Sequence, residues 1–253
     1  MKINVCSLFR DSQHWFGHDI KQVDRYFDQI KKQEDFLKRE LQGFSGFNIF
    51  AGEKDSKDNT RQVLEEYKND NNNIEIFDTE SSDSQVESTF DRVKNISKVA
   101  NSLLNKSFEQ KADYTLWIES DLIILRDDLV FELHKKLQSE NSAAIVAPII
   151  WCKIDHRLIF YDTWGFVCND GESWENSYPF NINYTSSDYR YLDMKSVGSC
   201  VLAKNSFISE DHFGTDAFRD FCKKTKEKGG KIYADKEVEI YHPSEHNIRQ
   251  RHI

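Results

Sequence analysis

The sequence predicts an α/β protein with a mostly parallel sheet flanked by helices. Strand-like apolar runs alternate with amphipathic helical segments over the first 150 residues, an order typical of such sheets. The run Tyr114–Ile118 leads directly into two carboxylates, Glu119 and Asp121. The chain has 253 residues, of which 38% are hydrophobic and 13% aromatic, which is enough for one large or two small domains with a sizeable core.

The first two strands are expected at Ile3–Phe9 and Phe47–Ala51, because each is a short apolar run that ends in polar residues. Between them, Gln22–Leu41 has apolar residues at roughly helical spacing, which predicts a helix. The second strand leads into a polar loop, Gly52–Thr60.

Asp58 or Asn59 is placed to cap the helix that follows this loop. A short strand is expected at Ile74–Phe77. Thr79–Ser88, rich in Ser, Asp and Glu, is expected to form a mobile loop. Phe90–Leu104 has the apolar stripe of an amphipathic helix.

The second half of the chain differs in character from the first. The strand Tyr114–Ile118 is still followed by a helix and a strand, but Trp151–Tyr191 is aromatic-rich, irregular and rich in turns. The elements expected from Asp127 onward are a helix at Asp127–Gln138, strands at Ala143–Ile149 and Ser196–Leu202, a helix at Thr215–Lys228, and closing strands at Lys231–Ala234 and Val238–Tyr241.

Glu119 and Asp121 form the most informative pattern in the sequence. They are two residues apart, so on an extended backbone their side chains point to the same side. Two carboxylates on one side at the end of a buried strand form a site for a hard cation that prefers oxygen ligands. A divalent cation at that place is suited to hold the diphosphate of a nucleotide.

The composition narrows the possible functions. The net charge is −9 and the isoelectric point is about 5.4, which disfavours a broad nucleic-acid interface because such surfaces are normally basic. Five cysteines without C-x-x-C spacing argue against a zinc cluster and indicate a reducing compartment. The apolar run at the N-terminus is too short for a signal peptide, and no stretch reaches the roughly 20 residues that span a bilayer. We therefore expect a soluble, cytoplasmic protein.

Four motifs, in order along the chain, resemble those of GT-A glycosyltransferases, which are Rossmann-like enzymes that use nucleotide-sugar donors and usually a divalent metal. The first strand with Arg10 and Asp11 is similar to the strand that contacts the nucleotide. Glu53–Thr60 (EKDSKDNT) resembles the family's E-N-x-S-x-D-x-T loop, and Glu119–Asp121 takes the place of the D-x-D motif. His242 is similar to the C-terminal histidine that completes the metal site. The resemblance covers nearly the whole chain and is nearest to the branch of fungal and capsule-associated mannosyltransferases.

This resemblance implies a single GT-A domain over residues 1–253. Residues 1–150 would bind the nucleotide-sugar, and residues 151–253 would bind the acceptor and close the metal site. Two positions depart from the pattern of the family. Glu119 replaces the first Asp of the D-x-D motif, which lengthens the side chain by one methylene, and Lys54 stands where the branch often has Asn.

The resemblance also implies a metal site that binds Mn²⁺ or Mg²⁺. Asp121 is expected to be a direct ligand and the central catalytic residue, while Glu119 is expected to hold the ribose or a metal-bound water. His242 supplies an imidazole ligand, which suits Mn²⁺ better than Mg²⁺. The metal neutralises the negative charge that develops on the leaving diphosphate.

The nucleotide site is expected at the carboxyl ends of the parallel strands, where open α/β sheets bind ligands. Its implied residues are Arg10, Asp11, Glu53 and Asp55 in the loops, with Arg92 and Lys98 on the helix before the acidic motif. Each also has a plainer interpretation, as a helix cap, a surface-loop residue or a solvated cation.

On the acceptor side, Asp216 is the first candidate for the general base, with Asp211 and Glu210 behind it. No such base is needed if the reaction retains configuration. The aromatic residues of the second half form either an acceptor surface or ordinary core packing. They are Trp151, Trp164, Trp174, Tyr178, Tyr184 and Tyr189.

Three rival interpretations remain open from the sequence. A sugar-phosphate nucleotidyltransferase shares the plan of the sheet, although the residues after the first strand lack the glycine-rich loop of that class. A non-catalytic nucleotide- or glycan-binding module on the same fold is the second. A glycosyltransferase that modifies DNA bases is the third, and the acidic isoelectric point disfavours it.

Overall fold

Helices and strands alternate along the first half of the chain, as the sequence predicts. The computed structural model describes residues 1–12, 21–79, 89–154, 157–172, 174–176, 178, 180–186 and 188–243. In this half the elements are β1 Ile3–Phe9, α1 Gln22–Glu40, β2 Phe47–Glu53, α2 Thr60–Asp70, β3 Ile74–Asp78, α3 Thr89–Phe108, β4 Tyr114–Ile118, α4 Leu129–Ser139 and β5 Ala143–Ile154. Except for Thr79, the predicted loop Thr79–Ser88 lies outside the described residues.

The second half contains shorter elements before it closes the sheet. They are β6 Arg157–Phe160, β7 Val167–Cys168, α5 Ile182–Ser186, β8 Tyr191–Ser196, β9 Cys200–Lys204, a 3₁₀ turn at Asn205–Phe207, α6 Ala217–Glu227 and β10 Lys231–His242.

The sheet of the described residues is mixed but mostly parallel at its centre. Its strand order is β3-β2-β1-β4-β9-β5-β10-β8-β7, and β6 pairs with β5 outside this path. The strands β1 to β4 are parallel to one another, and β5 is parallel to β10. Between these two groups lies β9, antiparallel to both β4 and β5, so all six of the parallel strands run in the same direction. Their carboxyl ends therefore meet at one edge of the sheet.

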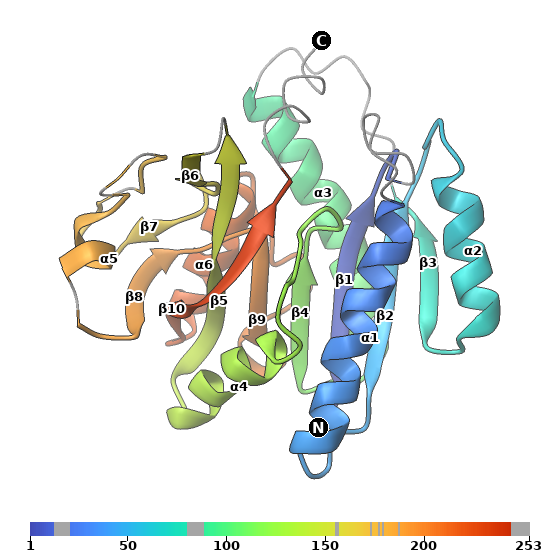
Figure 1. Ribbon diagram of the computed structural model, residues 1–253, viewed down its shortest axis with the longest axis horizontal. Coiled ribbons are helices and arrows are strands. Elements are labelled where there is room, and N and C mark those ends of the chain that lie inside the picture. The colour runs from blue at the N-terminus through green and yellow to red at the C-terminus, as the bar shows by residue number, and fades with distance from the viewer. Residues whose placement is uncertain are drawn as a thin grey trace.

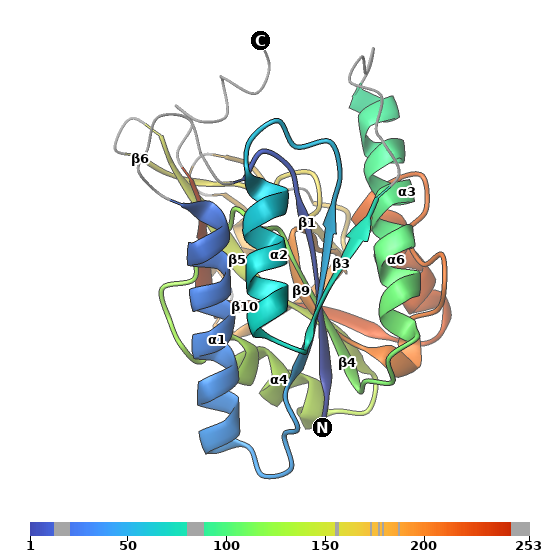
Figure 2. The same cartoon turned by 90° about the vertical axis from the view of Figure 1, so that its right-hand side faces the viewer.

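Helices cover both faces of the sheet. Figures 1 and 2 show α1, α2 and α4 on one face and α3 and α6 on the other. Side chains alternate along each strand, so each strand supplies residues to both layers. In β4, for example, Leu116 and Ile118 join the core under α1 and α4, whereas Trp117 joins the core under α3 and α6. The two cores hold the strand ends in fixed positions at the sheet edge.

The predicted strand Ser196–Leu202 is wrong as a single element. The chain ends β8 at Ser196 and starts β9 at Cys200, and the two strands pair with different partners in the sheet. Ser199 between them has φ of 56°, a left-handed conformation that a continuous strand does not adopt. Val197 and Cys200 are both fully buried, which is why the apolar pattern continues across the break.

The two predicted closing strands form one strand, β10, which is interrupted by a bulge. Its register against β5 shifts between Asp235 and Glu239, opposite Pro148 and Ile149 of β5. Pro148 has no amide N–H to donate to the ladder, and irregular pairing is common at such a position.

Candidate functional site

The polar residues singled out in the sequence lie at the carboxyl edge of the parallel strands. Arg10 and Asp11 follow β1, Glu53 ends β2 and leads into the loop before Thr60, and Glu119–Asp121 follows β4. His242 is the last residue of β10. In Figure 1 these strand ends point toward the top of the molecule. The sheet thus collects at one edge residues that are far apart in the sequence.

Asp121 and His242 are in direct contact. His242 Nε2 lies 3.3 Å from Asp121 Oδ2, and their side chains are 1% and 9% exposed. They meet although β9 and β5 separate β4 from β10 in the sheet. The segment after β4 crosses this gap and pairs with β10 through two backbone hydrogen bonds between Ile123 and Tyr241, of 2.7 and 3.0 Å.

The ring of His242 is held on two sides. Its Nδ1 lies 2.8 Å from the carbonyl oxygen of Pro243, and Tyr161 stacks on it with ring centroids 3.8 Å apart and planes 10° apart. An N–H on Nδ1 would donate to the Pro243 carbonyl and leave Nε2, which faces Asp121, with a lone pair for a metal.

A cation from α1 lies beside Asp121. Arg25 donates from Nη2 to the carbonyl oxygen of Asp121 at 3.1 Å. Burial lowers the pKa of Arg25, and the charge of Asp121 opposes that shift. Nearby, Gln22 Nε2 lies 3.4 Å from Ser120 Oγ. The start of α1 therefore fixes the backbone of the acidic motif and adds a positive charge to the site.

Asp121 and His242 are the residues of this edge that could hold a metal ion. A carboxylate and an imidazole are donors that Mn²⁺ accepts, and both are buried at a strand end. In the described part of the chain, no group of three His, Cys, Asp or Glu residues converges as a metal site. Two protein donors with the remaining ligands from phosphate and water is the pattern of a cation that binds together with a nucleotide.

The loop after β2 is organised by its own acidic residues. Glu53 is 3% exposed; its Oε1 accepts from the amide of Ser56 at 3.0 Å, and its Oε2 lies 3.5 Å from Arg61. Asp58 Oδ1 accepts from the amide of Thr60 at 3.0 Å, so Asp58 closes the turn before α2. Asn59, the residue before the helix, makes no side-chain cap.

The first and second loops are joined to each other. The amide of Asp11 donates to Ser56 Oγ at 3.1 Å, and the carboxylate of Asp11 accepts from the amide of Lys57. The amide of Ser12 donates to Thr60 Oγ1 at 2.7 Å. Asp11 has φ of 47°, which these bonds maintain. The two loops therefore form one rigid wall.

Of the other residues predicted to bind the nucleotide, three have exposed side chains and one has a side chain outside the described residues. Arg10 and Asp55 are exposed in these loops, and Asp55 has φ of 60°. Lys98 lies on the exposed side of α3. Arg92 is in the first turn of α3, and its side chain lies outside the described residues.

Asp216 is at the N-terminus of α6. Its carboxylate is 39% exposed and lies 4.0 Å from Arg219, one turn along the helix. The amide of Asp216 donates to Asp220 Oδ2 at 2.9 Å. Asp211 instead accepts from the side chain of Asn105 at 2.9 Å, which ties it to α3. Lys224 Nζ also donates to the backbone carbonyl of Asp211 at 2.7 Å, so each of these two acids lies near a cation.

The sequence interpretation did not find Asp162, which lies in the loop after β6. Asp162 Oδ1 accepts from the amide of Gly165 at 2.8 Å, and Oδ2 accepts from Ser199 Oγ at 2.9 Å. Burial raises the pKa of Asp162, against the opposing effect of these two hydrogen bonds. The available signal was a carboxylate within an apolar, aromatic run, Phe160–Gly165, that shows no helix or strand period.

The aromatic residues of the second half divide into buried and exposed side chains. Trp151 and Trp174 are 2% exposed and pack with Phe160, so they belong to the core. Trp164 is 51% exposed and has the guanidinium of Arg219 4.4 Å from its ring centroid. Tyr178 and Tyr189 are also exposed, whereas Tyr184 is half-buried against Trp151 and Trp174.

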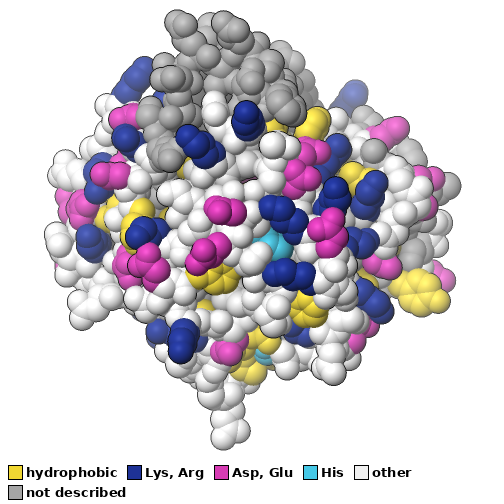
Figure 3. All heavy atoms as spheres, turned by 180° about the vertical axis from the view of Figure 1, so that it is seen from behind, with side chains coloured by type: hydrophobic (Ala, Val, Ile, Leu, Met, Phe, Trp, Pro, Cys, Tyr) yellow, Lys and Arg dark blue, Asp and Glu magenta, His cyan; other side chains and the backbone are white. Residues whose placement is uncertain are grey.

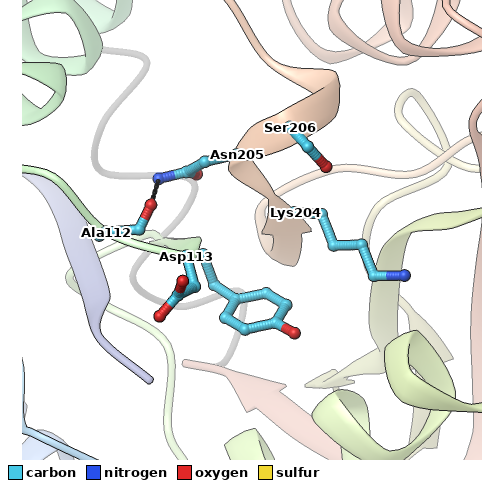
Figure 4. A pocket seen from close by; sticks show the side chains of 6 residues that line it. Ala112, Asp113, Lys204, Asn205 and Ser206 are labelled. Atoms are coloured by element: carbon cyan, nitrogen blue, oxygen red, sulfur yellow. Dashed lines mark hydrogen bonds between the residues drawn. The ribbon is translucent and has the colours of Figure 1, made fainter. Parts of the chain in front are cut away.

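Away from this edge of the sheet, the surface has a shallow pocket and a face of mixed charge. Figure 4 shows a shallow pocket of about 380 Å³ where β4 starts and β9 ends, lined by residues that include Asp113, Lys204 and Asn205. Because the acidic motif is at the other end of β4, this pocket lies at the opposite edge of the sheet. Figure 3 shows acidic and basic side chains interspersed on the face of α3 and α6, without a uniformly basic surface there.

Together, the strand order, the helices on both faces and the polar strand ends define the GT-A fold of glycosyltransferases. The comparison with solved structures gives particular examples. Residues 1–349 of TarS from S. aureus superpose with a TM-score of 0.57 at 16% identity, covering 99% of this chain and 63% of that one.

Two further structures with this fold carry a nucleotide and a metal. GalNAc-T7 in complex with UDP, GalNAc and Mn²⁺ gives a TM-score of 0.59 at 11% identity, covering 96% of this chain and 43% of that chain. The mannosyltransferase PcManGT from Pyrobaculum calidifontis, in complex with GDP-Man and Mn²⁺, gives 0.55 at 10% identity, covering 95% and 56%.

The present chain spans less than two thirds of the length of each of these structures. No family model matches the sequence, and no curated protein matches it. Among the described residues, no helix is long and apolar enough to cross a membrane.

Proposed function

We propose that this protein is a metal-dependent glycosyltransferase that moves a hexose or pentose from a nucleotide-sugar to a hydroxyl acceptor. The observation that carries the proposal is the contact of 3.3 Å between Asp121 and His242 at the carboxyl edge of a GT-A sheet. GalNAc-T7 and PcManGT, which have this fold, are described with a nucleotide or nucleotide-sugar and Mn²⁺. The finer placement among fungal and capsule-associated mannosyltransferases stays a prediction.

Asp121 and His242 would hold Mn²⁺ or Mg²⁺, which supplies Lewis-acid neutralisation of the leaving diphosphate. Arg25, beside Asp121, adds a positive charge that also favours the negative charge of the leaving diphosphate. Glu119, two residues earlier, is proposed to contact the ribose or a water at the metal. The buried position of this group raises the strength of each electrostatic contact.

The joined loops after β1 and β2 are proposed to bind the nucleoside. The Glu53 carboxylate already accepts from the loop amide of Ser56, so its expected role is to shape the pocket. Arg10, Asp11 and Asp55 are proposed to contact the base or the ribose hydroxyls.

The acceptor is proposed to approach from the side of α6 and the loop after β6. Asp216 is the candidate base that removes the proton of the acceptor hydroxyl in an inverting reaction. Arg219 lies beside Asp216, and the exposed indole of Trp164 packs on the guanidinium of Arg219. A glycan is the preferred acceptor, because sugar C–H faces stack on aromatic rings and the net charge of −9 disfavours DNA.

A donor screen tests this function. UDP-, GDP-, ADP- and dTDP-sugars are incubated with the protein in Mn²⁺, in Mg²⁺ and in EDTA, and free nucleoside diphosphate is measured. We expect slow, metal-dependent hydrolysis of one donor, which a mixture of glycan or DNA acceptors then accelerates. Binding and turnover of no nucleotide-sugar in any metal would refute the proposal.

Two further measurements, of pyrophosphate release and of ligand affinity, test the other two rivals. A sugar-phosphate nucleotidyltransferase would release pyrophosphate from a nucleoside triphosphate and a sugar 1-phosphate. A non-catalytic module would bind its ligand with equal affinity before and after the substitution Asp121→Ala.

A further inference from the structure

The carboxylate of Asp162 joins two loops at the edge of the candidate site. One oxygen accepts from the amide of Gly165 at 2.8 Å, and the other accepts from Ser199 Oγ at 2.9 Å. A Cβ on Gly165 or on Gly198 would lie within 2.8 Å of Asp162 Oδ2. The two glycines therefore permit an approach that any side chain would block.

Ser199 connects Asp162 to the acidic motif, because it forms hydrogen bonds with both Asp162 and Glu119. Its carbonyl oxygen accepts from the amide of Glu119 at 3.0 Å, while its hydroxyl donates to Asp162. Its φ of 56° is unfavourable for a serine, and such a conformation persists where surrounding bonds enforce it. Asp162 is thus one residue away from the backbone that positions Glu119.

The residues next to Asp162 reach the two other parts of the site. Tyr161 stacks on the ring of His242 at 3.8 Å, and its own amide donates to the carbonyl of Ile150 at 2.9 Å. The carbonyl of Trp164 accepts from Arg219 Nε at 2.8 Å, on the helix that begins at Asp216. The turn 161–165 therefore contacts His242 and α6 directly, and it reaches the acidic motif through Ser199.

We infer that Asp162 is a positioning residue of the donor site. By closing the turn 161–165 against Ser199, it holds the backbone of Glu119 and the ring of His242 in one arrangement. This inference rests on the proposed function for its effect on donor binding. It requires no contact between Asp162 and the substrate.

Three substitutions separate geometry from charge. Asp162→Ala removes both hydrogen bonds. Asp162→Asn can keep both, because the amide oxygen accepts from Gly165 and the amide nitrogen donates to Ser199 Oγ. Ser199→Ala removes only the hydrogen bond from the Ser199 hydroxyl to Asp162, and keeps the backbone hydrogen bond between Ser199 and Glu119. Asp170→Ala is the matched control, since Asp170 is an exposed aspartate in the same region that also accepts a backbone amide, from Glu172 at 3.0 Å.

The first measurement is the affinity for Mn²⁺ with UDP or GDP, by titration of the Mn²⁺ electron paramagnetic signal. We expect affinity at least tenfold weaker in Asp162→Ala and several-fold weaker in Ser199→Ala. Asp162→Asn should recover most of the wild-type affinity, and Asp170→Ala should not differ from wild type. If Asp162→Asn is as impaired as Asp162→Ala, the negative charge is what matters and the inference is overturned.

The second measurement needs no ligand and therefore separates this inference from the proposed function. Hydrogen exchange at the amide of Glu119 should be at least tenfold faster in Asp162→Ala and in Ser199→Ala, with exchange at Leu116 in β4 unchanged. Unchanged exchange at Glu119 overturns the inference even if the enzyme is active. If no nucleotide binds to the wild type, the proposed function fails, and the exchange result alone decides this coupling. Should Asp162→Ala not fold, Ser199→Ala carries both measurements.

Discussion

Asp121 is the residue on which the proposed chemistry depends most directly. The substitution Asp121→Asn keeps the size of the side chain but removes the charge that a divalent cation requires. We expect metal-dependent turnover to fall by at least about 100-fold, which corresponds to about 3 kcal/mol of transition-state stabilisation. Rates of donor hydrolysis at saturating Mn²⁺ measure this effect.

Asp127→Asn is the control for this prediction. Asp127 is an exposed carboxylate in the same connection between β4 and α4, so its loss changes the net charge equally. Turnover should stay at the wild-type level. Equal loss of activity in both variants would show that Asp121 has no special role as a ligand.

His212 gives a residue-scale prediction about pH. It is fully buried, with Nε2 3.0 Å from Thr225 Oγ1, and burial lowers its pKa to about 4 from the usual 6.5. The unfolded chain therefore takes up a proton below pH 6.5, whereas the folded protein does so only near pH 4. Stability present above pH 6.5 is lost as the pH falls through this window, by roughly 3 kcal/mol.

Urea unfolding of the wild type and of His212→Gln between pH 4 and pH 7 tests this prediction. The variant has lost the ionisable group, so its stability should fall less over this range. Burial also lowers the pKa of His134, so part of the slope should remain in the variant. Identical slopes in the two proteins would contradict the assignment to His212.

At the residue scale, the sequence predicts those site residues that stand directly at the end of a strand. Asp121 follows β4 and His242 ends β10. Hydrophobic periodicity predicted the strands before these two residues, and the resemblance to GT-A glycosyltransferases implied that the residues share one site. Asp162 and Arg25 were missed because their positions depend on the tertiary path of the chain. Asp162, which follows β6 on β5, meets Ser199 because β9 lies next to β5, and Arg25 contacts Asp121 because α1 packs across the sheet.

At the scale of elements, one ion-pair cluster connects α4, β8 and β10. Arg190 donates to Asp235 at 2.7 and 2.9 Å and to Glu132 at 2.8 Å, and Asp235 is fully buried at the bulge of β10. Arg190→Ala leaves this carboxylate buried without its cation, so we expect a loss of about 3 kcal/mol in the free energy of unfolding. Chemical denaturation measures the loss, and Arg39→Ala on the exposed end of α1 should lose less than about 0.5 kcal/mol.

The loop after β6 gives a prediction about the acceptor. Trp164→Ala removes the exposed indole beside Arg219 and leaves the metal side in place. We expect the KM for the acceptor to rise about tenfold, because one stacking contact contributes roughly 1–1.5 kcal/mol, with little change in the KM for the donor. Steady-state kinetics with each substrate varied in turn distinguish the two. An equal rise in both KM values would argue against an acceptor role for Trp164.

The elements of the first half were predicted closely, because each strand and helix there has one clear hydrophobic period. The second half was predicted less well. The strand β8 was not predicted, and its end was merged with β9, because buried apolar residues continue through the turn at Val197–Ser199. The left-handed backbone at Ser199 is enforced by Asp162 and Glu119, which are distant in the sequence, so no local pattern reveals it.

At the scale of the whole molecule, the fold should not depend on the metal. The two hydrophobic cores form from apolar side chains on each face of the sheet, and Asp121 and His242 are the two buried donors that meet at its edge. EDTA should therefore leave the melting temperature unchanged. Mn²⁺ and nucleotide together at about 100 times the dissociation constant should add about 2.7 kcal/mol, and so several degrees.

Thermal unfolding followed by fluorescence tests this prediction, with Mn²⁺ alone and nucleotide alone as controls. Each alone should shift the transition less than the pair, because two protein donors leave most coordination positions to phosphate and water. A large shift with Mn²⁺ alone would indicate a resident metal site.

The bridge between Ile123 and Tyr241 implies an order in which parts of the sheet form during folding. The four parallel strands β1 to β4 contain only residues from the first 118 positions, so they can assemble early. Asp121 and His242 can meet only after β10 has paired with β5. This pairing closes a long loop of the chain, and pairings between residues distant in sequence form slowly. During refolding, the capacity to hold a cation should therefore be among the last properties to appear, and its arrival would mark the completed molecule.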